Sequence, residues 1–156
     1  MLERLNMSTT IIRLANLHDI AQLAKLFDAY RQFYEQAPNI ALASTFIAER
    51  LNKRESVIFA AENDVKQLIG FCQIYPSFCS VAAVKIGVLY DLFVDANARK
   101  TGAGKALMLA AHEYAKNNGF ARLDLSTAKT NLAAQALYES LGWVRDEVFY
   151  TYSKAF

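Results

Sequence analysis

The sequence has little cysteine, no excess of one charge and no long hydrophobic run. Two cysteines are too few for a disulfide framework, and Cys72 and Cys79 have no histidine cluster near them, which argues against a metal site. No apolar run reaches the roughly 18 residues of a membrane-spanning helix, and the N-terminus lacks the apolar stretch of a signal peptide. We therefore expect a cytoplasmic protein with reduced cysteines, no metal and no membrane association.

The balance of charge and the apolar content narrow the class of protein further. Lys and Arg number 17 and Asp and Glu 15, so the formal net charge is +2. A nucleic-acid-binding protein usually carries a basic stripe, and this chain has none, so we expect no nucleic-acid partner. A hydrophobic fraction of 54% in 156 residues excludes a disordered chain. That length predicts a single domain over residues 1–156, with residues 1–8 as a short tail.

The spacing of apolar residues predicts an α/β fold. Alternating or β-branched runs indicate strands, and apolar residues spaced by three and four indicate helices. In chain order we predict a strand at 9–14, helices at 20–34 and 40–51, strands at 56–61, 67–75 and 83–94, a helix at 106–117, a strand at 122–127, a helix at 131–141, and short strands at 143–145 and 149–152.

Turn residues and connections indicate how these elements are arranged in a sheet. Asn63 and Asp64 join two strands into a hairpin, and Pro76 with Ser77 is expected to end the second of them. The helix between the strands at 83–94 and 122–127 makes a crossover, which implies a parallel pair. The predicted order is β-α-α-β-β-β-α-β-α-β-β, with a mixed central sheet.

A glycine loop is the strongest local signal. Residues 99–104 read Arg-Lys-Thr-Gly-Ala-Gly and lie between a strand and a helix, where free N–H groups and the helix dipole favour an anion. The loop fails as a Walker motif because Arg99 stands where the first glycine is needed, and it fails as a dinucleotide motif because residue 107 is Leu. An R-x-x-G-x-G phosphate loop and a plain flexible connection remain open.

The loop and its surroundings resemble a known superfamily. The strand at 84–94, the loop, and the Ala-Leu-Tyr-Glu-Ser-Leu-Gly-Trp of 136–143 resemble the GCN5-related N-acetyltransferase (GNAT) superfamily. Residues 90–95 and 30–35 are most similar to the yeast Hpa-type histone and polyamine acetyltransferases. The resemblance implies central parallel strands that splay apart around acetyl-CoA. It also implies acetyl transfer to a primary amine, on a polyamine, a protein lysine or a small molecule, and a homodimer.

The resemblance also implies how acetyl-CoA is held. Main-chain groups of Leu92, Phe93 and Val94 would pair with the pantetheine arm. Asn131 would contact the cofactor, although capping of its own helix explains it nearly as well. The pyrophosphate would lie on the loop formed by Arg99, Lys100, Thr101, Gly102, Ala103, Gly104 and Lys105.

Two residues are the catalytic candidates. Tyr138 stands where the superfamily carries a tyrosine that protonates the departing thiolate, and a packing role is its alternative. Asp91, just before the splay, is the candidate general base, with Glu35 as a second possibility. Tyr90 precedes Asp91 where polyamine enzymes carry a glutamate, which argues against a polyamine-specific mechanism.

The expected acceptor rim includes Tyr30, Tyr34 and Glu35, because the first two helices form it in the superfamily. No motif places a nucleophile, so transfer is expected to be direct, in a ternary complex. The alternative to an enzyme is a CoA-binding or CoA-sensing module without catalysis.

Overall fold

The computed structural model describes residues 9–156, in two units. The first unit ends at Leu125 and the second runs from Ser126 to Phe156, and each is described by itself. The predicted tail at 1–8 lies outside the described residues, and a single domain over 1–156 stays a prediction. No helix within residues 9–156 is long and apolar enough to cross a membrane.

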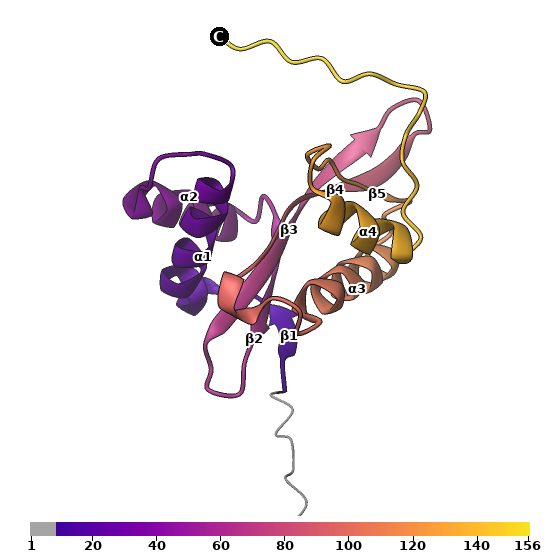
Figure 1. Ribbon diagram of the computed structural model, residues 1–156. Helices are drawn as coiled ribbons and strands as arrows, with labels where there is room; N and C mark the ends of the chain where they lie inside the picture. The colour runs from indigo at the N-terminus through magenta and orange to yellow at the C-terminus, as the bar shows by residue number, and fades with distance from the viewer. Residues whose placement is uncertain (1–8) are drawn as a thin grey trace, which may run out of the picture. The chain divides into compact units, whose positions relative to one another are not determined.

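The first unit is a five-stranded mixed sheet with helices on both faces (Figure 1). The sheet order is β1-β2-β3-β4-β5; the first three pairings are antiparallel and the last is parallel. This confirms the predicted hairpin and crossover. The strands are β1 (Ile11–Leu14), β2 (Val57–Glu62), β3 (Leu68–Cys79), β4 (Val84–Val94) and β5 (Leu123–Asp124); the helices are α1 (Ile20–Phe33), α2 (Ile40–Lys53) and α3 (Ala103–Asn117), with short 3₁₀ turns η1 (Leu17–Asp19) and η2 (Ala96–Ala98).

Alternating side chains of the sheet supply two apolar faces. On one face, Ile58 and Phe71 pack with buried residues of α1 and α2. On the other, Phe59 lies 5.7 Å from the Tyr114 ring of α3. The Cys72 thiol also faces α3 and donates to the Leu107 carbonyl at 3.7 Å. Figure 1 shows α1 and α2 on one side of the sheet and α3 on the other.

The prediction that Pro76 ends its strand was wrong, because β3 continues to Cys79. Proline interrupts a ladder only where its missing N–H is needed. Pro76 pairs with Gly87, and the Gly87 N–H donates to Arg122 on the opposite side of β4. In an antiparallel ladder the pair is then not hydrogen-bonded, so the Pro76 nitrogen faces away from β4. The β2 ladder has already ended at Ile74, and no donor is lost.

A β-bulge interrupts the β3–β4 ladder and shapes the first unit's candidate site. Gln73 lies opposite Asp91, but the next residue, Ile74, lies opposite Leu89, so Tyr90 is an extra residue without a β3 partner. The bulge gives two neighbouring side chains very different exposure to solvent. Tyr90 is 67% exposed and Asp91 only 4%.

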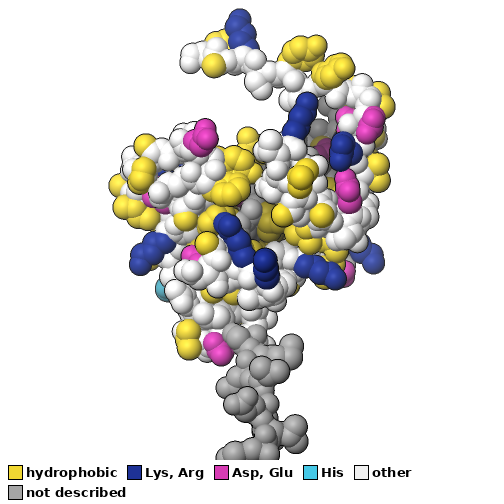
Figure 2. All heavy atoms as spheres, in the orientation of Figure 1, with side chains coloured by type: hydrophobic (Ala, Val, Ile, Leu, Met, Phe, Trp, Pro, Cys, Tyr) yellow, Lys and Arg dark blue, Asp and Glu magenta, His cyan; other side chains and the backbone are white. Residues whose placement is uncertain are grey.

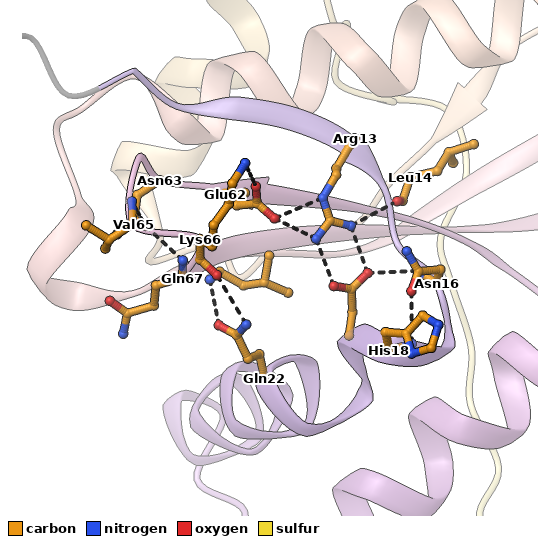
Figure 3. Close-up of polar contacts among 12 residues, drawn as sticks. Arg13, Leu14, Asn16, His18, Gln22, Glu62, Asn63, Val65, Lys66 and Gln67 are labelled. Atoms are coloured by element: carbon orange, nitrogen blue, oxygen red, sulfur yellow. Dashed lines mark hydrogen bonds and ion pairs between the residues drawn. The ribbon is translucent and has the colours of Figure 1, made fainter.

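A group of ion pairs ties the start of the sheet to the start of α1 (Figure 3). The Arg13 guanidinium on β1 donates to both carboxylate oxygens of Asp19 at 2.8 Å and to Glu62 on β2 at 2.7 Å. Lys66 adds a 3.1 Å contact to Glu62. The two carboxylates are almost fully buried, so they depend on Arg13 for compensation.

The second unit contains one helix, α4 (Leu132–Ser140), and no strand. The final strands predicted at 143–145 and 149–152 were therefore wrong, and β5 is shorter than its predicted range of 122–127. A strand requires a neighbouring strand for its main-chain hydrogen bonds, and a local pattern cannot reveal whether that neighbour exists. Most of the apolar side chains that the pattern assigned to these strands are exposed, from 81% at Phe149 to 91% at Val144.

Candidate active site

The candidate site begins where β4 loses its parallel neighbour. The β4–β5 ladder consists of Gly87 with Leu123 and Val88 with Asp124. Beyond them, residues 89–94 have no β5 partner, and all of them except Tyr90 pair with β3. The Asp95 N–H donates to Ile69 of β3, so by alternation Phe93 is hydrogen-bonded to β3, whereas main-chain groups of Leu92 and Val94 face the free edge. An extended ligand could pair with that edge as a strand would.

The glycine loop forms an uncapped helix start. The chain turns through η2, and Lys100 and Gly102 adopt positive φ angles of 63° and 86°. The α3 helix then begins at Ala103 rather than at the predicted Ala106, so Gly104 falls within its first turn. Gly102 stands at the N-cap without a side-chain cap, which leaves the first N–H groups of α3 open to an anion.

Cationic side chains surround this helix start. Arg99, Lys100 and Lys105 are all exposed, and Figure 2 shows dark-blue Lys and Arg side chains over the loop. Arg99 is held in place, since its Nε donates to the Val94 carbonyl at 3.2 Å and its guanidinium lies 5.7 Å from the Phe93 ring. The loop thus joins helix N–H groups to full positive charges, the combination that binds phosphate.

A buried carboxylate lies on β4 within the unpaired stretch. Asp91 accepts a 2.7 Å hydrogen bond from Gln73 Nε2 on β3. Burial raises the pKa of Asp91, while the hydrogen bonds of Gln73 and Tyr30 act in the opposite direction. Asp91 is thus easier to protonate than an exposed aspartate, as suits a proton acceptor in a reaction.

Tyr30 on α1 covers this carboxylate. Its hydroxyl donates to the Tyr90 carbonyl at 3.4 Å and lies beside Asp91, and the pKa of Tyr30 is raised by its burial and then by the Asp91 charge. The Tyr30 ring lies 5.2 Å from the Tyr34 ring and 6.0 Å from the Phe93 ring. The structure therefore places Tyr30 against Asp91 and Tyr34 beside Tyr30.

Glu35, the second candidate base, differs from Asp91 in its surroundings. It is exposed, it lies two residues beyond the end of α1, and its φ of 62° is left-handed. Its carboxylate is thus in water, whereas Asp91 is buried.

The remaining candidates lie in the second unit. Asn131 caps α4, with its side-chain oxygen accepting from the Ala134 N–H at 3.2 Å. Tyr138 is half-buried on α4, and its ring lies 6.2 Å from the Trp143 ring. Capping and packing are thus real roles of these two side chains, and a role in catalysis stays a prediction.

Two polar residues of the first unit, Gln73 and Ser56, were not identified from the sequence. Gln73 is completely buried, and its Oε1 accepts from the Ser56 hydroxyl at 2.6 Å, while its Nε2 donates to Asp91. A single amide side chain inside the apolar run Phe-Cys-Gln-Ile-Tyr of 71–75 is the signal that could have identified it. Across residues 9–156, no group of three or more His, Cys, Asp or Glu side chains is placed to hold a metal ion.

Comparisons with known proteins agree with this geometry. Residues 21–143 match the sequence profile of the Acetyltransferase (GNAT) family. The chain is 45% identical over 141 residues to the uncharacterized N-acetyltransferase YhfO of Bacillus subtilis, covering 90% of this chain and 94% of that protein. It is 33% identical over 96 residues to a probable acetyltransferase of Haemophilus influenzae, covering 62% of this chain and 66% of that one. A crystal structure of a probable acetyltransferase has a TM-score of 0.88 at 35% identity, covering 94% of this chain and 97% of that one.

Proposed function

Because the chain belongs to the acetyltransferase (GNAT) family and is an N-acetyltransferase, we propose that it moves acetyl from acetyl-CoA directly to a primary amine in a ternary complex. The observation that carries this proposal is the position of Asp91. It is a buried carboxylate on β4, within the stretch 89–94 that β5 leaves unpaired. The proton acceptor and the strand edge that can bind the pantetheine arm of the thioester are thus adjacent in the sequence.

The loop fits the diphosphate part of acetyl-CoA. A Cβ at Gly102 would meet no atom of the protein within 4 Å, so the space beside it is open. We assign the pyrophosphate to the N-terminal N–H groups of α3, supported by Arg99, Lys100 and Lys105. The pantetheine amides are assigned to the main chain of residues 92–94, and Asn131 is a further contact.

The chain's residues then handle the protons. An amine reaches the site largely as ammonium, since its pKa is near that of lysine. Asp91 accepts one proton and passes it to water, which frees the nitrogen lone pair for attack on the thioester carbon. The C–N bond forms and the C–S bond breaks, and Tyr138 donates its proton to sulfur. The second proton lost by nitrogen restores Tyr138, so the products are the amide, CoA thiol and one released proton.

The acceptor and the assembly are finer parts of the proposal. The Tyr30 ring beside the Asp91 carboxylate, with the Tyr34 ring next to it, favours a cationic amine. The resemblance to the Hpa-type enzymes makes polyamines and lysine peptides the first acceptors to test. Exposed apolar side chains in the second unit, such as Phe149 and Tyr150, support a homodimer. A cytoplasmic location remains part of the proposal.

The proposed function is tested by thiol release. We expect the protein to release CoA thiol from acetyl-CoA when polyamines, amino acids or lysine peptides are added one at a time. Mass spectrometry of the acceptor should show the gain of one acetyl group. Binding of acetyl-CoA without turnover of any amine would instead support a CoA-binding module, which the family relationship does not favour.

Removing the Tyr138 hydroxyl tests the proposed acid. We expect Tyr138→Phe to lower kcat about tenfold to a hundredfold, at the low end for acid catalysis because a thiolate is a tolerable leaving group. Acetyl-CoA affinity should stay unchanged. Tyr114→Phe is the matched control, since Tyr114 is also a half-buried helical tyrosine. Unchanged turnover in Tyr138→Phe would remove the acid assignment.

A glycine replacement tests the phosphate loop. We expect Gly102→Ala to weaken acetyl-CoA binding about tenfold, because a Cβ at φ 86° strains the loop and occupies the space assigned to phosphate. Gly119→Ala is the matched control at the other end of α3, with a φ of 74° and equally open surroundings. Calorimetric titration of acetyl-CoA measures both variants. Equal losses in the two would mean that Gly102 matters for stability alone.

A further inference from the structure

We propose that Gln73, oriented by Ser56, is a positioning residue that keeps Asp91 ionised and fixed in its proton-accepting geometry. The inference rests on the proposed function, because it assigns a second layer of residues to the base of that reaction. It concerns two side chains that no sequence motif pointed to.

Three side chains form a continuous chain of hydrogen bonds. The Ser56 hydroxyl lies 2.6 Å from Gln73 Oε1, and Gln73 Nε2 lies 2.7 Å from Asp91 Oδ2. Gln73 is 0% exposed and Asp91 4% exposed. Gln73 and Asp91 are also direct cross-strand partners at the edge of the β-bulge. Neither group is surrounded by water, so each depends on the other for its polar contacts.

The amide of Gln73 has one orientation that satisfies both ends. Its oxygen accepts from the Ser56 hydroxyl, which leaves the amide nitrogen to face Asp91. The opposite orientation would place two acceptor oxygens, amide and carboxylate, against each other. While Asp91 is ionised, the Gln73 amide therefore presents a donor to it, and a donor stabilises the charged carboxylate over the protonated acid.

The hydrogen bond from Gln73 has a strong influence on the charge of Asp91 because of the groups that surround this carboxylate. Burial acts to raise the pKa of Asp91, and the hydrogen bonds from Gln73 and Tyr30 oppose that effect. Burial raises the pKa of Cys72 and of Tyr75 on β3 to about 12, so both side chains are uncharged at neutral pH. Arg50 and Glu55, near Tyr75, pair with each other at 2.8 Å. Tyr30 of α1 and Gln73 of β3 hydrogen-bond to Asp91, and the Asp91 charge acts on Cys72 and Tyr75 of β3. Tyr90 of β4 and the Arg50–Glu55 pair at the end of α2 lie near Tyr75.

The pH profile of acetyl transfer tests the inference. In Gln73→Leu the donor is lost, and we expect the acidic limb of kcat/KM to move up by about one to two pH units. Ser56→Ala frees the amide to turn and should move the limb in the same direction by less. Gln32→Leu is the matched control, because Gln32 donates to another carboxylate, Asp28, at 3.2 Å; its limb should not move. Acetyl-CoA affinity should be the same in all four proteins.

A direct titration separates this inference from the proposed function. Carbon-13 resonances of aspartate carboxyls, with Asp91 assigned by its loss in Asp91→Asn, should titrate at higher pH in Gln73→Leu than in the wild type. An unmoved Asp91 titration would overturn the role of Gln73, even in an active enzyme. A wild type that acetylates no amine would overturn the proposed function, and the titration would still decide the role of Gln73.

A second variant keeps the test decisive if Gln73→Leu does not fold. Gln73→Glu preserves the shape of the side chain and places a second carboxylate beside Asp91. Two adjacent carboxylates share a proton, so one of them should titrate well above the usual aspartate range. We expect low transfer at neutral pH that recovers as the pH rises. A Gln73→Glu profile identical to that of the wild type would overturn the inference.

Discussion

Asp91→Asn is expected to lower kcat/KM for acetyl transfer by about 10²–10⁴-fold, the range for loss of a general base. Asn has the shape of Asp, and its side-chain oxygen still accepts from Gln73 Nε2, so the buried position remains filled and satisfied. What is lost is the ability to take a proton from the ammonium. Acetyl-CoA affinity should be unchanged, since the loop at 99–105 is untouched.

The control for this experiment is another buried aspartate. Asp28 on α1 is 7% exposed and accepts hydrogen bonds from Arg31, Gln32 and the Asn39 N–H. We expect Asp28→Asn to reduce thermal stability but to leave kcat/KM within a few fold of the wild type. Steady-state assays across a pH range measure both variants. A loss below about threefold in Asp91→Asn, or an equal loss in Asp28→Asn, would exclude Asp91 as the base.

Local patterns predicted most of the first unit, because local residues decide most of its elements. Asp19 and Asn39 mark the starts of α1 and α2, and apolar spacing marks their buried faces. The start of α3 was placed three residues late because glycine counts against a helix in sequence terms. In the structure, Gly102 ends the loop with its positive φ, and Gly104 is an ordinary residue of the first turn of α3.

Features that depend on distant partners were not predictable. Pro76 continues a strand because its nitrogen lies on the side that β2 no longer occupies, and this depends on the lengths of two other strands. The strands expected after α4 failed for the related reason that alternation does not supply a partner. Composition and spacing can be read from one segment, whereas the hydrogen-bond ladder of a sheet depends on two segments.

The candidate site also combines a feature that one segment predicts with a feature that depends on distant partners. The glycine loop at 99–104 is contiguous in the sequence, so its motif could be recognised from the sequence alone. The Ser56–Gln73–Asp91 chain joins residues 17 and 18 positions apart through a bulge, and Tyr30 reaches Asp91 from a separate helix. A buried polar residue in an apolar strand indicates that a partner exists. Only the register of β3 against β4 identifies that partner as Asp91.

Arg13→Ala is expected to lower the melting temperature by about 5–10 °C. Arg13 compensates Asp19 and Glu62, whose side chains are 7% and 9% exposed, and removing one member of a buried ion group leaves the others uncompensated. The expected loss is moderated because Arg13 itself is 31% exposed and water can reach its site. Arg122→Ala is the matched control, since the Arg122–Asp124 pair is 49% and 46% exposed and should contribute less than about 2 °C.

The same variant should also change how stability depends on pH. Arg13 holds the pKa of Asp19 and of Glu62 below their ordinary values of 3.8 and 4.5. A depressed carboxyl pKa contributes stability above the unfolded value, and this contribution is lost as the pH falls toward the folded value. The wild type should therefore lose stability steeply below about pH 4.5, and Arg13→Ala less steeply, so that the two melting temperatures converge in acid. Thermal melts from pH 7 to pH 3 measure this. A constant difference across that range would mean that Arg13 stabilises the fold through packing of its side chain rather than through its charge.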